Sequence, residues 1–354
     1  MTSLPHPLDA ARVAPSPRER GERRGEGRIR ELGPIAARTL AMAHGGRIVA
    51  RFERSAYLEL GDDLVCIGTP DLGSGPLNAR VESAQALDAI RRARHDEVVC
   101  RDGVLRIGRT SLSFANARLW RPTSVALPID ARRLARGVEH VRALARTRVP
   151  SEGLASLVAE ATGSPLVTEA SGSSALACAG RKAALALHAW LGGGDDARLS
   201  PLAALIGLGP GLTPSGDDFL GGALVALHGY GRACDARRLA GHLRLEGATH
   251  PISVAHWRAA CEGLGSDALH ACLRDMAEGR HAHASLARVA AIGHTSGWDA
   301  LAGAMTVAAA LSRATAGAGA DYRARNTRSA SSAACAFDGA TATPAVSSVR
   351  TWRE

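Results

Sequence analysis

Hydrophobic and polar residues alternate with a period of two through the first third of the chain. The pattern is seen in residues 47–60 (RIVARFERSAYLEL) and 103–108 (GVLRIG), residues 64–68 (LVCIG) are a short apolar run, and Gly and Asp residues separate these segments. Strict alternation with Gly and Asp breaks is typical of short antiparallel strands. We therefore predict a small β-rich domain over residues 29–127, a sandwich or partial barrel, interrupted by one short helix at 84–94.

From residue 129 onward the apolar positions recur with a period of about 3.6, which predicts helices. Many of the predicted helices are rich in Ala and Gly, so their backbones are able to approach closely. The predicted fold class is α+β: a small N-terminal β domain followed by a larger Ala/Gly-rich helical domain over residues 128–313. The predicted helices span residues 130–146, 151–162, 172–191, 198–206, 215–229, 233–245, 251–263, 266–278, 281–291 and 297–312.

The two ends of the chain have a different composition from the rest. Residues 1–28 are basic, residues 314–354 are rich in Ala, Ser, Gly and Thr, and neither end has hydrophobic periodicity, so we expect both to be disordered. The chain contains neither a run of 18 apolar residues nor an apolar segment behind its basic N-terminus. We therefore expect a cytoplasmic protein with no membrane partner. The seven cysteines occur singly, without a C-x-x-C pair, and are interpreted as buried small hydrophobic residues.

The net charge of +9 and the pI near 9.8 are the kind of values that nucleic-acid-binding proteins have. The distribution of the charge argues against that function, because arginines concentrate in the two end segments and Lys182 is the only lysine. Aromatic residues make up only 3% of the chain, so few side chains are available to stack on bases. We therefore expect no nucleic-acid partner.

Residues 207–222 read GLGPGLTPSGDDFLGG, and the end of this segment is echoed later in the chain. Residues 215–223 and 296–304 share the pattern S-G-x-D-x-L-x-G-A. A serine followed three positions later by an acidic residue is also the pattern of a helix capping box. Under this interpretation Asp218 and Asp299 only satisfy amides at the start of their own helices.

Capping leaves the glycines before Ser215, and the additional carboxylate of Asp217, without a purpose. Amides without neighbouring side chains, placed ahead of a helix N-terminus, are suited to binding an anion such as phosphate or carboxylate. An adjacent carboxylate would repel that anion unless a cation lies between them, which makes Asp217 a candidate ligand for Mg²⁺. We favour a ligand-binding loop over a purely structural one. The sequence does not match a Walker A loop or a dinucleotide-binding fingerprint.

Three segments together resemble a known family: residues 207–222, residues 249–253 (THPIS) and residues 293–304 (GHTSGWDALAGA). The chain resembles, over about residues 30–312, the bacterial family of formerly unknown function that includes the AllH subunit of oxamate carbamoyltransferase. The resemblance implies carbamoyl phosphate, oxamate and oxalurate chemistry in purine or allantoin nitrogen catabolism. It also implies an acyl-CoA-synthetase-like protein and a further carbamoyltransferase subunit as partners.

Carbamoyl transfer needs a cradle for phosphate, donors for the oxyanion and a site for the acceptor, and these needs select the candidate residues. The candidate catalytic residues are Ser215, Asp217, Asp218 and Asp299. The candidate ligand-binding residues are Gly209, Gly211, Thr213, Gly216, Thr249, Ser253, His294, Thr295, Ser296 and Gly297. Because both copies of the repeated pattern would serve one anionic ligand, we expect the helices that begin near Ser215 and Ser296 to converge.

Two classes of function stay open. The chain is either an enzymatic subunit that takes part in carbamoyl transfer, or a non-catalytic subunit that binds an anion or metabolite and acts as a scaffold. A second glycine-rich loop at residues 73–78 (GSGPLN) is either a lid over the site or a connection between strands, and we favour the connection.

Overall fold

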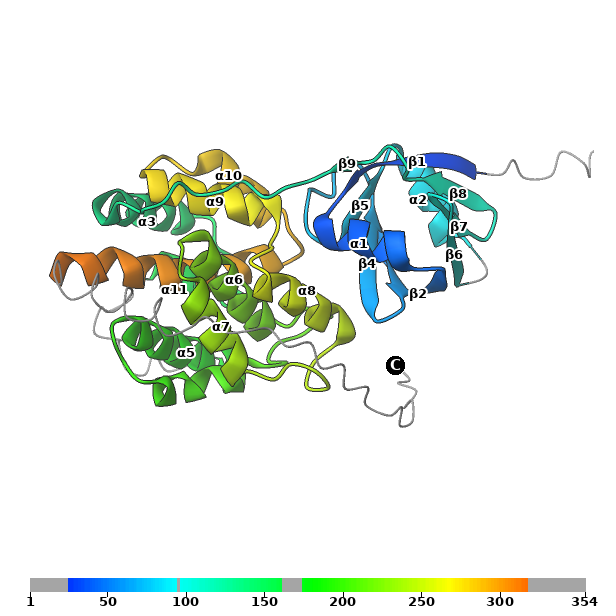
Figure 1. Cartoon of the computed structure of the whole chain (residues 1–354). Coiled ribbons are helices and arrows are strands. Elements are labelled where there is room, and N and C mark those ends of the chain that lie inside the picture. Colours follow the sequence, from blue (N-terminus) through cyan, green and yellow to red (C-terminus); the bar gives the residue numbers. More distant parts are fainter. Residues whose placement is uncertain (1–24, 94–95, 161–173, 318–354) are drawn as a thin grey trace, which may run out of the picture. The chain divides into compact units, whose positions relative to one another are not determined.

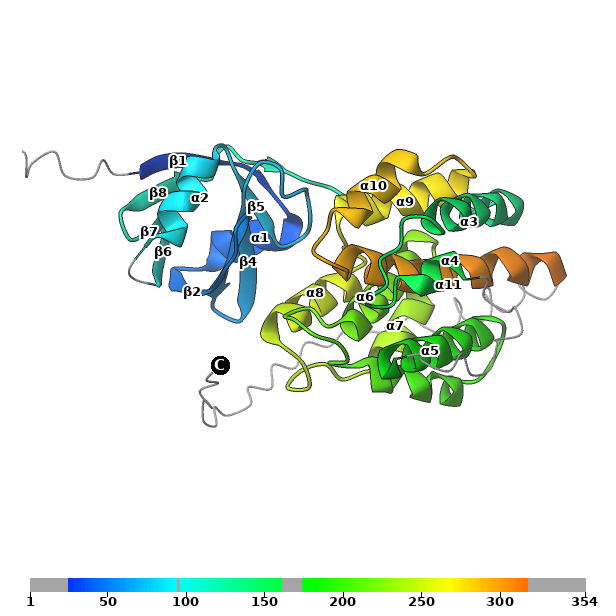
Figure 2. The same ribbon diagram turned by 180° about the vertical axis from the view of Figure 1, so that it is seen from behind.

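The computed structural model describes residues 25–93, 96–160 and 174–317, and the predicted α+β class is confirmed (Figures 1 and 2). The N-terminal part holds nine strands, β1 to β9, and two helices, α1 and α2. The strands are β1 (Gly25–Leu32), β2 (Gly45–Arg51), β3 (Ser55–Leu60), β4 (Asp63–Gly68), β5 (Asn78–Val81), β6 (Glu97–Arg101), β7 (Val104–Ile107), β8 (Thr110–Ser113) and β9 (Arg118–Leu119). The helices are α1 (Pro34–Met42) and α2 (Ala84–Arg91).

The strands form a closed barrel. The order along the sheet is β5-β4-β3-β2-β6-β7-β8-β1-β9, and an additional antiparallel pairing of β1 with β5 joins the ends. Strand β1 makes this closure possible because residues 25–28 pair with β8 and residues 31–32 pair with β9. Alternate side chains point inward, as β6 shows with buried Val98 and Cys100 between exposed neighbours. The predicted partial barrel is therefore complete.

The remaining described residues form helices, and most of the predicted ranges are confirmed. They are α3 (Ala131–Ala145), α4 (Ser156–Ala159), α5 (Ala175–Leu191), the 3₁₀ helix η1 (Asp196–Leu205), α6 (Ser215–Gly229), α7 (Ala233–His242), α8 (Pro251–Cys261), α9 (Asp267–Glu278), α10 (His283–Ala290) and α11 (Ser296–Gly317). The largest differences are α4, which is much shorter than the predicted 151–162, and α1, which was not predicted. In the N-terminal part, α2 lies within the predicted 84–94.

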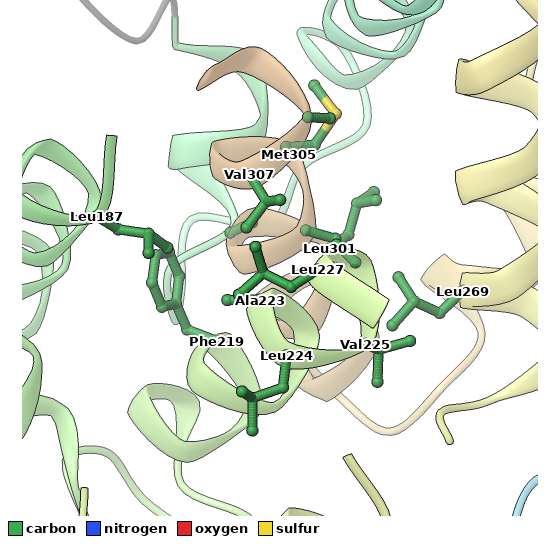
Figure 3. Close-up of a cluster of buried hydrophobic side chains, with 14 of the residues drawn as sticks. Leu187, Phe219, Ala223, Leu224, Val225, Leu227, Leu269, Leu301, Met305 and Val307 are labelled. Carbon is green, nitrogen blue, oxygen red and sulfur yellow. The ribbon is translucent and has the colours of Figure 1, made fainter. Parts of the chain in front are cut away.

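Helices α6 and α11 lie in the middle of the helical part, with α3, α9 and α10 on one side and α5 and α7 on the other (Figures 1 and 2). Figure 3 shows the apolar side chains where α6 and α11 meet, among them Phe219, Ala223, Leu301 and Val307. All four of these residues are fully buried. The core of the helical part is therefore built around this pair of helices.

Glycines bring the two central helices into backbone contact. A Cβ atom on Gly222 would lie 1.8 Å from the carbonyl oxygen of Ala300, and a Cβ atom on Gly303 would lie 1.9 Å from the carbonyl oxygen of Phe219. No side chain fits at either position without moving one of the helices. This contact explains why the repeated pattern contains a glycine four positions after each aspartate.

The barrel is connected to the helical part by a small apolar cluster and by polar contacts. Ile35, Cys66 and Leu77 of the barrel pack with Ala259 of α8. The glycine-rich loop at residues 73–78 joins β4 to β5, and the carbonyl of Ser74 accepts the amide N–H of Asp267 at 2.9 Å. The described contacts of this loop are those of a connection between strands.

Several expectations concern the chain ends, the cysteines and membranes. Residues 1–24 and 318–354, which include most of the predicted disordered ends and Cys335, lie outside the described residues. The prediction of disorder is wrong for residues 25–28, which belong to β1, and for residues 314–317, which belong to α11. The prediction of buried cysteines holds for Cys66, Cys100 and Cys272 but is wrong for Cys178 and Cys234, which are exposed. Of the helices in the described ranges, none has the length and apolar character that a membrane crossing requires.

The close approach of α6 and α11 predicts the effect of adding one methyl group. Gly222→Ala should lower the free energy of unfolding by about 2 kcal/mol or more, because the methyl group would overlap the Ala300 carbonyl. Chemical denaturation measures this change. The matched control is Gly221→Ala in the same helix, where the nearest atom is 3.8 Å away. That control should be neutral or stabilising by up to about 1 kcal/mol, since alanine favours helix more than glycine. Equal destabilisation by both variants would contradict the account of the helix crossing.

Candidate functional site

The loop that leads into α6 needs its glycines for their backbone conformation. Gly207, Gly209 and Gly211 have φ angles of +68°, +123° and +90°, a region that other residues rarely adopt. Gly209 also folds back onto the helix start, because a Cβ atom there would lie 2.8 Å from the amide nitrogen of Ser215. The loop thus presents its peptide groups at the N-terminus of α6.

The amides of this loop are available to a ligand. In the part of the chain that the structure describes, no hydrogen bond engages the backbone N–H groups of Gly209, Gly211, Leu212 or Thr213. The neighbouring amides differ, since the N–H of Leu208 bonds to the carbonyl of Leu205 and the N–H of Gly216 bonds to the carbonyl of Leu208. The free amides are therefore grouped in one short stretch ahead of α6, where the helix dipole also favours a negative charge.

Asp217 is buried and both of its carboxylate oxygens are occupied. Its Oδ1 accepts the amide N–H of Gly207 at 2.8 Å, and its Oδ2 accepts the hydroxyls of Thr249 at 2.5 Å and Ser253 at 2.7 Å. This arrangement ties the glycine loop and the start of α8 to the first turn of α6. Three of the predicted site residues, Asp217, Thr249 and Ser253, thus meet in one cluster.

The environment of Asp217 does not fit the metal-ligand role that the sequence suggested. Its oxygens are satisfied by three protein donors, which leaves little capacity for coordinating a cation. Among the residues placed by the structure, no group of three or more His, Cys, Asp and Glu side chains is arranged to hold a metal ion. Asp217 instead has the contacts of a residue that positions the loop.

Asp218 has a different environment. Its Oδ2 is buried without a hydrogen-bond partner, and the hydroxyls of Thr213 and Ser296, which lie 3.0 Å apart, are close to its carboxyl group. Burial raises the pKa of Asp218 well above its usual value of 3.8, and the charges of Asp299 and Asp217 raise it further, while the hydroxyls of Ser296 and Thr213 act in the opposite direction. Asp218 is therefore held toward its neutral form, in which it donates a hydrogen bond instead of repelling an anion.

Asp299 occupies the equivalent position on α11 and is fully buried. Its Oδ1 accepts the amide N–H of Leu154 at 2.6 Å, and its Oδ2 is buried without a partner. Burial raises the pKa of Asp299, whereas the Leu154 amide and the hydroxyls of Thr295 and Ser215 lower it. Each aspartate is thus influenced by the serine of the opposite helix.

These contacts between each aspartate and the serine of the opposite helix are present in place of the capping box that the sequence suggested for α6. Ser215 is already the first helical residue, and Pro214 at the cap position makes no side-chain cap bond, so the predicted box of Ser215 with Asp218 is wrong. The prediction that the two helix starts converge is confirmed by the 3.0 Å contact between the hydroxyls of Thr213 and Ser296. The sequence pattern that was interpreted as a capping box therefore belongs to a contact between α6 and α11.

The other predicted residues have less direct contacts with this cluster. His294 lies at the surface, where its Nε2 is 2.5 Å from the Oε2 of Glu152. The carbonyl of Thr295 accepts the amide N–H of Asp299. Gly216 and Gly297 allow close approach, because a Cβ atom on either would lie 2.0 Å from a backbone carbonyl oxygen. These two glycines shape the helix starts.

Two residues of this region were missed by the sequence analysis. The phenol of Tyr57 on β3 lies 3.1 Å from the Nε2 of His256 on α8. Burial lowers the pKa of His256 to about 4, so its ring is neutral near pH 7. Burial also raises the pKa of Tyr57 well above its usual value, and the charges of Cys66 and Asp218 add to this effect. Tyr57 could not be linked to the site from the sequence, because β3 is far from α8 along the chain. His256 lies one turn beyond Ser253 on α8, and this spacing was a signal that could have identified it.

A protein-family model described as oxamate carbamoyltransferase subunit AllH matches residues 205–308. Over this segment the chain is similar to the AllH family. The segment that matches AllH begins immediately before the glycine loop and ends within α11, so it includes Asp217, Asp218 and Asp299. Leu154 and Tyr57 lie outside the AllH match. No solved structure matches the chain.

The opposite environments of two adjacent aspartates predict opposite effects of the same substitution. Asp217→Asn should destabilise the protein by about 2 kcal/mol, because an amide cannot accept all three buried hydrogen bonds. Asp218→Asn should stabilise it at neutral pH by removing a carboxyl group whose ionisation is disfavoured in the folded state. Thermal unfolding of both variants from pH 4 to pH 8 provides the measurement.

The sign of the pH dependence follows from the raised pKa of Asp218. The folded protein binds this proton more tightly than the unfolded chain, so the stabilising contribution is complete below the unfolded-state pKa and is lost as pH rises through the folded-state pKa. The melting temperature of Asp218→Asn relative to wild type should therefore increase with pH and reach about 2 °C or more at pH 8. A difference that is independent of pH would contradict a raised pKa at Asp218.

Proposed function

We propose that this protein is a cytoplasmic subunit of an oxamate carbamoyltransferase-like system and that the loop at residues 207–214 binds the anionic group of its ligand. The match of residues 205–308 to the AllH family model supports a role as a subunit of such a system. The observation that carries the proposal is the combination of four free loop amides with Asp218, whose Oδ2 is buried without a hydrogen-bond partner and whose pKa is raised by burial. The ligand is carbamoyl phosphate or an acceptor of the oxamate and oxalurate type in purine or allantoin nitrogen catabolism.

The raised pKa of Asp218 weakens the electrostatic objection to an anion at this loop, because it favours the neutral carboxyl group. A charged carboxylate beside the free amides would repel phosphate, and a metal bridge through Asp217 is disfavoured by its three protein donors. The free amides, the N-terminus of α6 and the hydroxyls of Thr213 and Ser296 then form a set of donors for the anion. No cation is required to balance the charge.

The same donors suit carbamoyl transfer. In the synthetic direction the amide nitrogen of the acceptor forms a bond to the carbamoyl carbon, the bond from that carbon to the phosphate oxygen breaks, phosphate leaves with the electron pair, and the nitrogen loses a proton. The reaction needs positioning and oxyanion stabilisation and does not need a protein nucleophile. Asp217 holds the loop in position through its three hydrogen bonds. Ser215 and Asp299 lie at the starts of α6 and α11, which contact each other.

The proposed partners are an acyl-CoA-synthetase-like protein and a further carbamoyltransferase subunit. The alternative is a non-catalytic subunit of the same kind of complex that binds the anion and acts as a scaffold. A direct assay distinguishes the enzymatic role from the scaffold role. It measures phosphate release from carbamoyl phosphate, with oxamate as acceptor, for the purified chain alone and with its partner subunits.

A paired glycine substitution tests whether the loop carries this function. Gly211 and Gly193 both have positive φ angles, +90° and +109°, and a Cβ atom on either would meet nothing within 4 Å. Alanine should therefore impose a similar local backbone strain at both positions. Gly211→Ala should weaken carbamoyl phosphate binding about ten-fold or more in isothermal titration, because it redirects the loop amides, whereas Gly193→Ala should leave binding unchanged.

The partner-reconstituted assay separates the two proposed roles. If Gly211→Ala lowers both binding and phosphate release, the loop takes part in catalysis. Normal turnover by a complex that contains Gly211→Ala would contradict the enzymatic role. Unchanged binding of carbamoyl phosphate by Gly211→Ala would contradict the loop as its binding site.

A further inference from the structure

The two central helices contact each other symmetrically at their glycines, because each helix contributes the same kind of contact once. Gly222 of α6 faces the carbonyl of Ala300 on α11, and Gly303 of α11 faces the carbonyl of Phe219 on α6. Phe219 and Ala300 are equivalent positions in the repeated sequence pattern. The symmetry extends to the helix starts, where Ser215 lowers the pKa of Asp299 and Ser296 lowers the pKa of Asp218.

The two aspartates in the first turns of α6 and α11 share one feature. In both Asp218 and Asp299 the Oδ2 atom is buried and has no hydrogen-bond partner. Their remaining oxygens are expected to have equivalent surroundings if the symmetry is complete. A difference between the surroundings of Asp218 and those of Asp299 therefore shows where the two repeated segments differ in structure.

On the α11 side the remaining oxygen is bound by the protein backbone. The Leu154 amide donates its N–H to Oδ1 of Asp299 at 2.6 Å. Gly153, with a φ angle of +68°, makes this approach possible, because a Cβ atom there would lie 2.5 Å from the same oxygen. Asp299 is fully buried beneath this turn.

On the α6 side the described part of the chain contains no such segment. Within residues 25–93, 96–160 and 174–317, no backbone N–H donates to Asp218, and the residue is partly exposed. The free amides of the glycine loop lie directly before this helix start. Among the described residues, therefore, no backbone amide takes at Asp218 the place that Leu154 takes at Asp299, and Asp218 lies next to the free loop amides that form the proposed anion cradle.

We propose that the ligand supplies to Asp218 the N–H donor that Leu154 supplies to Asp299. The ligand then carries two groups on one small frame: an anionic group for the loop amides and a carbamoyl or primary amide group for Asp218. This inference rests on the proposed function and assigns Asp218 as the residue that distinguishes a carbamoyl group from an acyl group of the same shape.

The chemistry of the two groups is complementary. A neutral carboxyl group offers one acceptor and one donor, and a carbamoyl group offers an N–H donor and a carbonyl acceptor in the matching order. An acetyl group of similar size keeps the carbonyl and lacks the N–H. A site that is built to accept an N–H discriminates strongly against an analogue without it, because its own acceptor is then left unpaired.

Binding of three anions to the full-length chain tests this assignment. Isothermal titration with inorganic phosphate, acetyl phosphate and carbamoyl phosphate separates the anion cradle from recognition of the N–H group. Wild type should bind carbamoyl phosphate at least about ten-fold more tightly than acetyl phosphate. Asp218→Asn should keep this preference, since its side-chain amide carries both a donor and an acceptor, and Asp218→Leu should lose it while still binding phosphate.

The outcomes distinguish failure of this inference from failure of the proposed function. Equal affinity of wild type for the two acyl phosphates, with phosphate bound, would overturn the role of Asp218 and leave the anion cradle in place. Absence of binding of all three anions would overturn the cradle and the inference together. Retention of the preference in Asp218→Leu, with circular dichroism unchanged, would also overturn the assignment.

Discussion

The crossing of α6 and α11 at two glycines is the contact on which the rest of the site depends. Gly222 and Gly303 let each helix backbone reach a carbonyl of the other, so the first turns of both helices are held side by side. That proximity places Asp218 near Asp299 and Ser296 and buries Asp299 and the Oδ2 atom of Asp218. The raised pKa values of two acids at the start of two helices are a consequence of this packing.

Adjacent residues in the same turn have opposite functions because they face different partners. Asp217 points to hydroxyl and amide donors that fix the glycine loop and α8. Asp218 points to the helix crossing, where burial opposes its ionisation. The structural cost of an ionisable group in a buried position is a common feature of binding and catalytic sites. This cost supports a functional role for Asp218, because a purely structural residue there would be better replaced by a neutral one.

Much of the fold follows from the sequence, because the change of hydrophobic period from two to 3.6 marks the barrel and the helical part. The barrel closure could not be predicted, since it depends on β1 pairing with β5, β8 and β9 along different parts of its length. Helix α1 was missed because it has only nine residues, although its buried residues Ile35, Ala36, Thr39 and Leu40 have helical spacing.

The candidate site was predicted in its residues and only partly in their roles. The repeated S-G-x-D pattern located Asp218 and Asp299, and their convergence follows from the repeat. The contact of each serine with the aspartate of the other helix could not be predicted from one helix, because the sequence pattern is identical to that of a capping box. The contacts of Tyr57 with His256 and of Leu154 with Asp299 join residues far apart in sequence, and only the tertiary fold brings them together.

The charge state of Asp218 is the central claim, and infrared spectroscopy tests it directly. The carbonyl stretch of a protonated carboxylic acid is separate from that of a carboxylate, so wild type, Asp218→Asn and Asp299→Asn are compared at pH 7. The account predicts a protonated carboxylic acid band in wild type that is reduced in Asp218→Asn and that responds to phosphate binding. A spectrum at pH 7 without this band, or a band that Asp218→Asn leaves unchanged, would contradict the account.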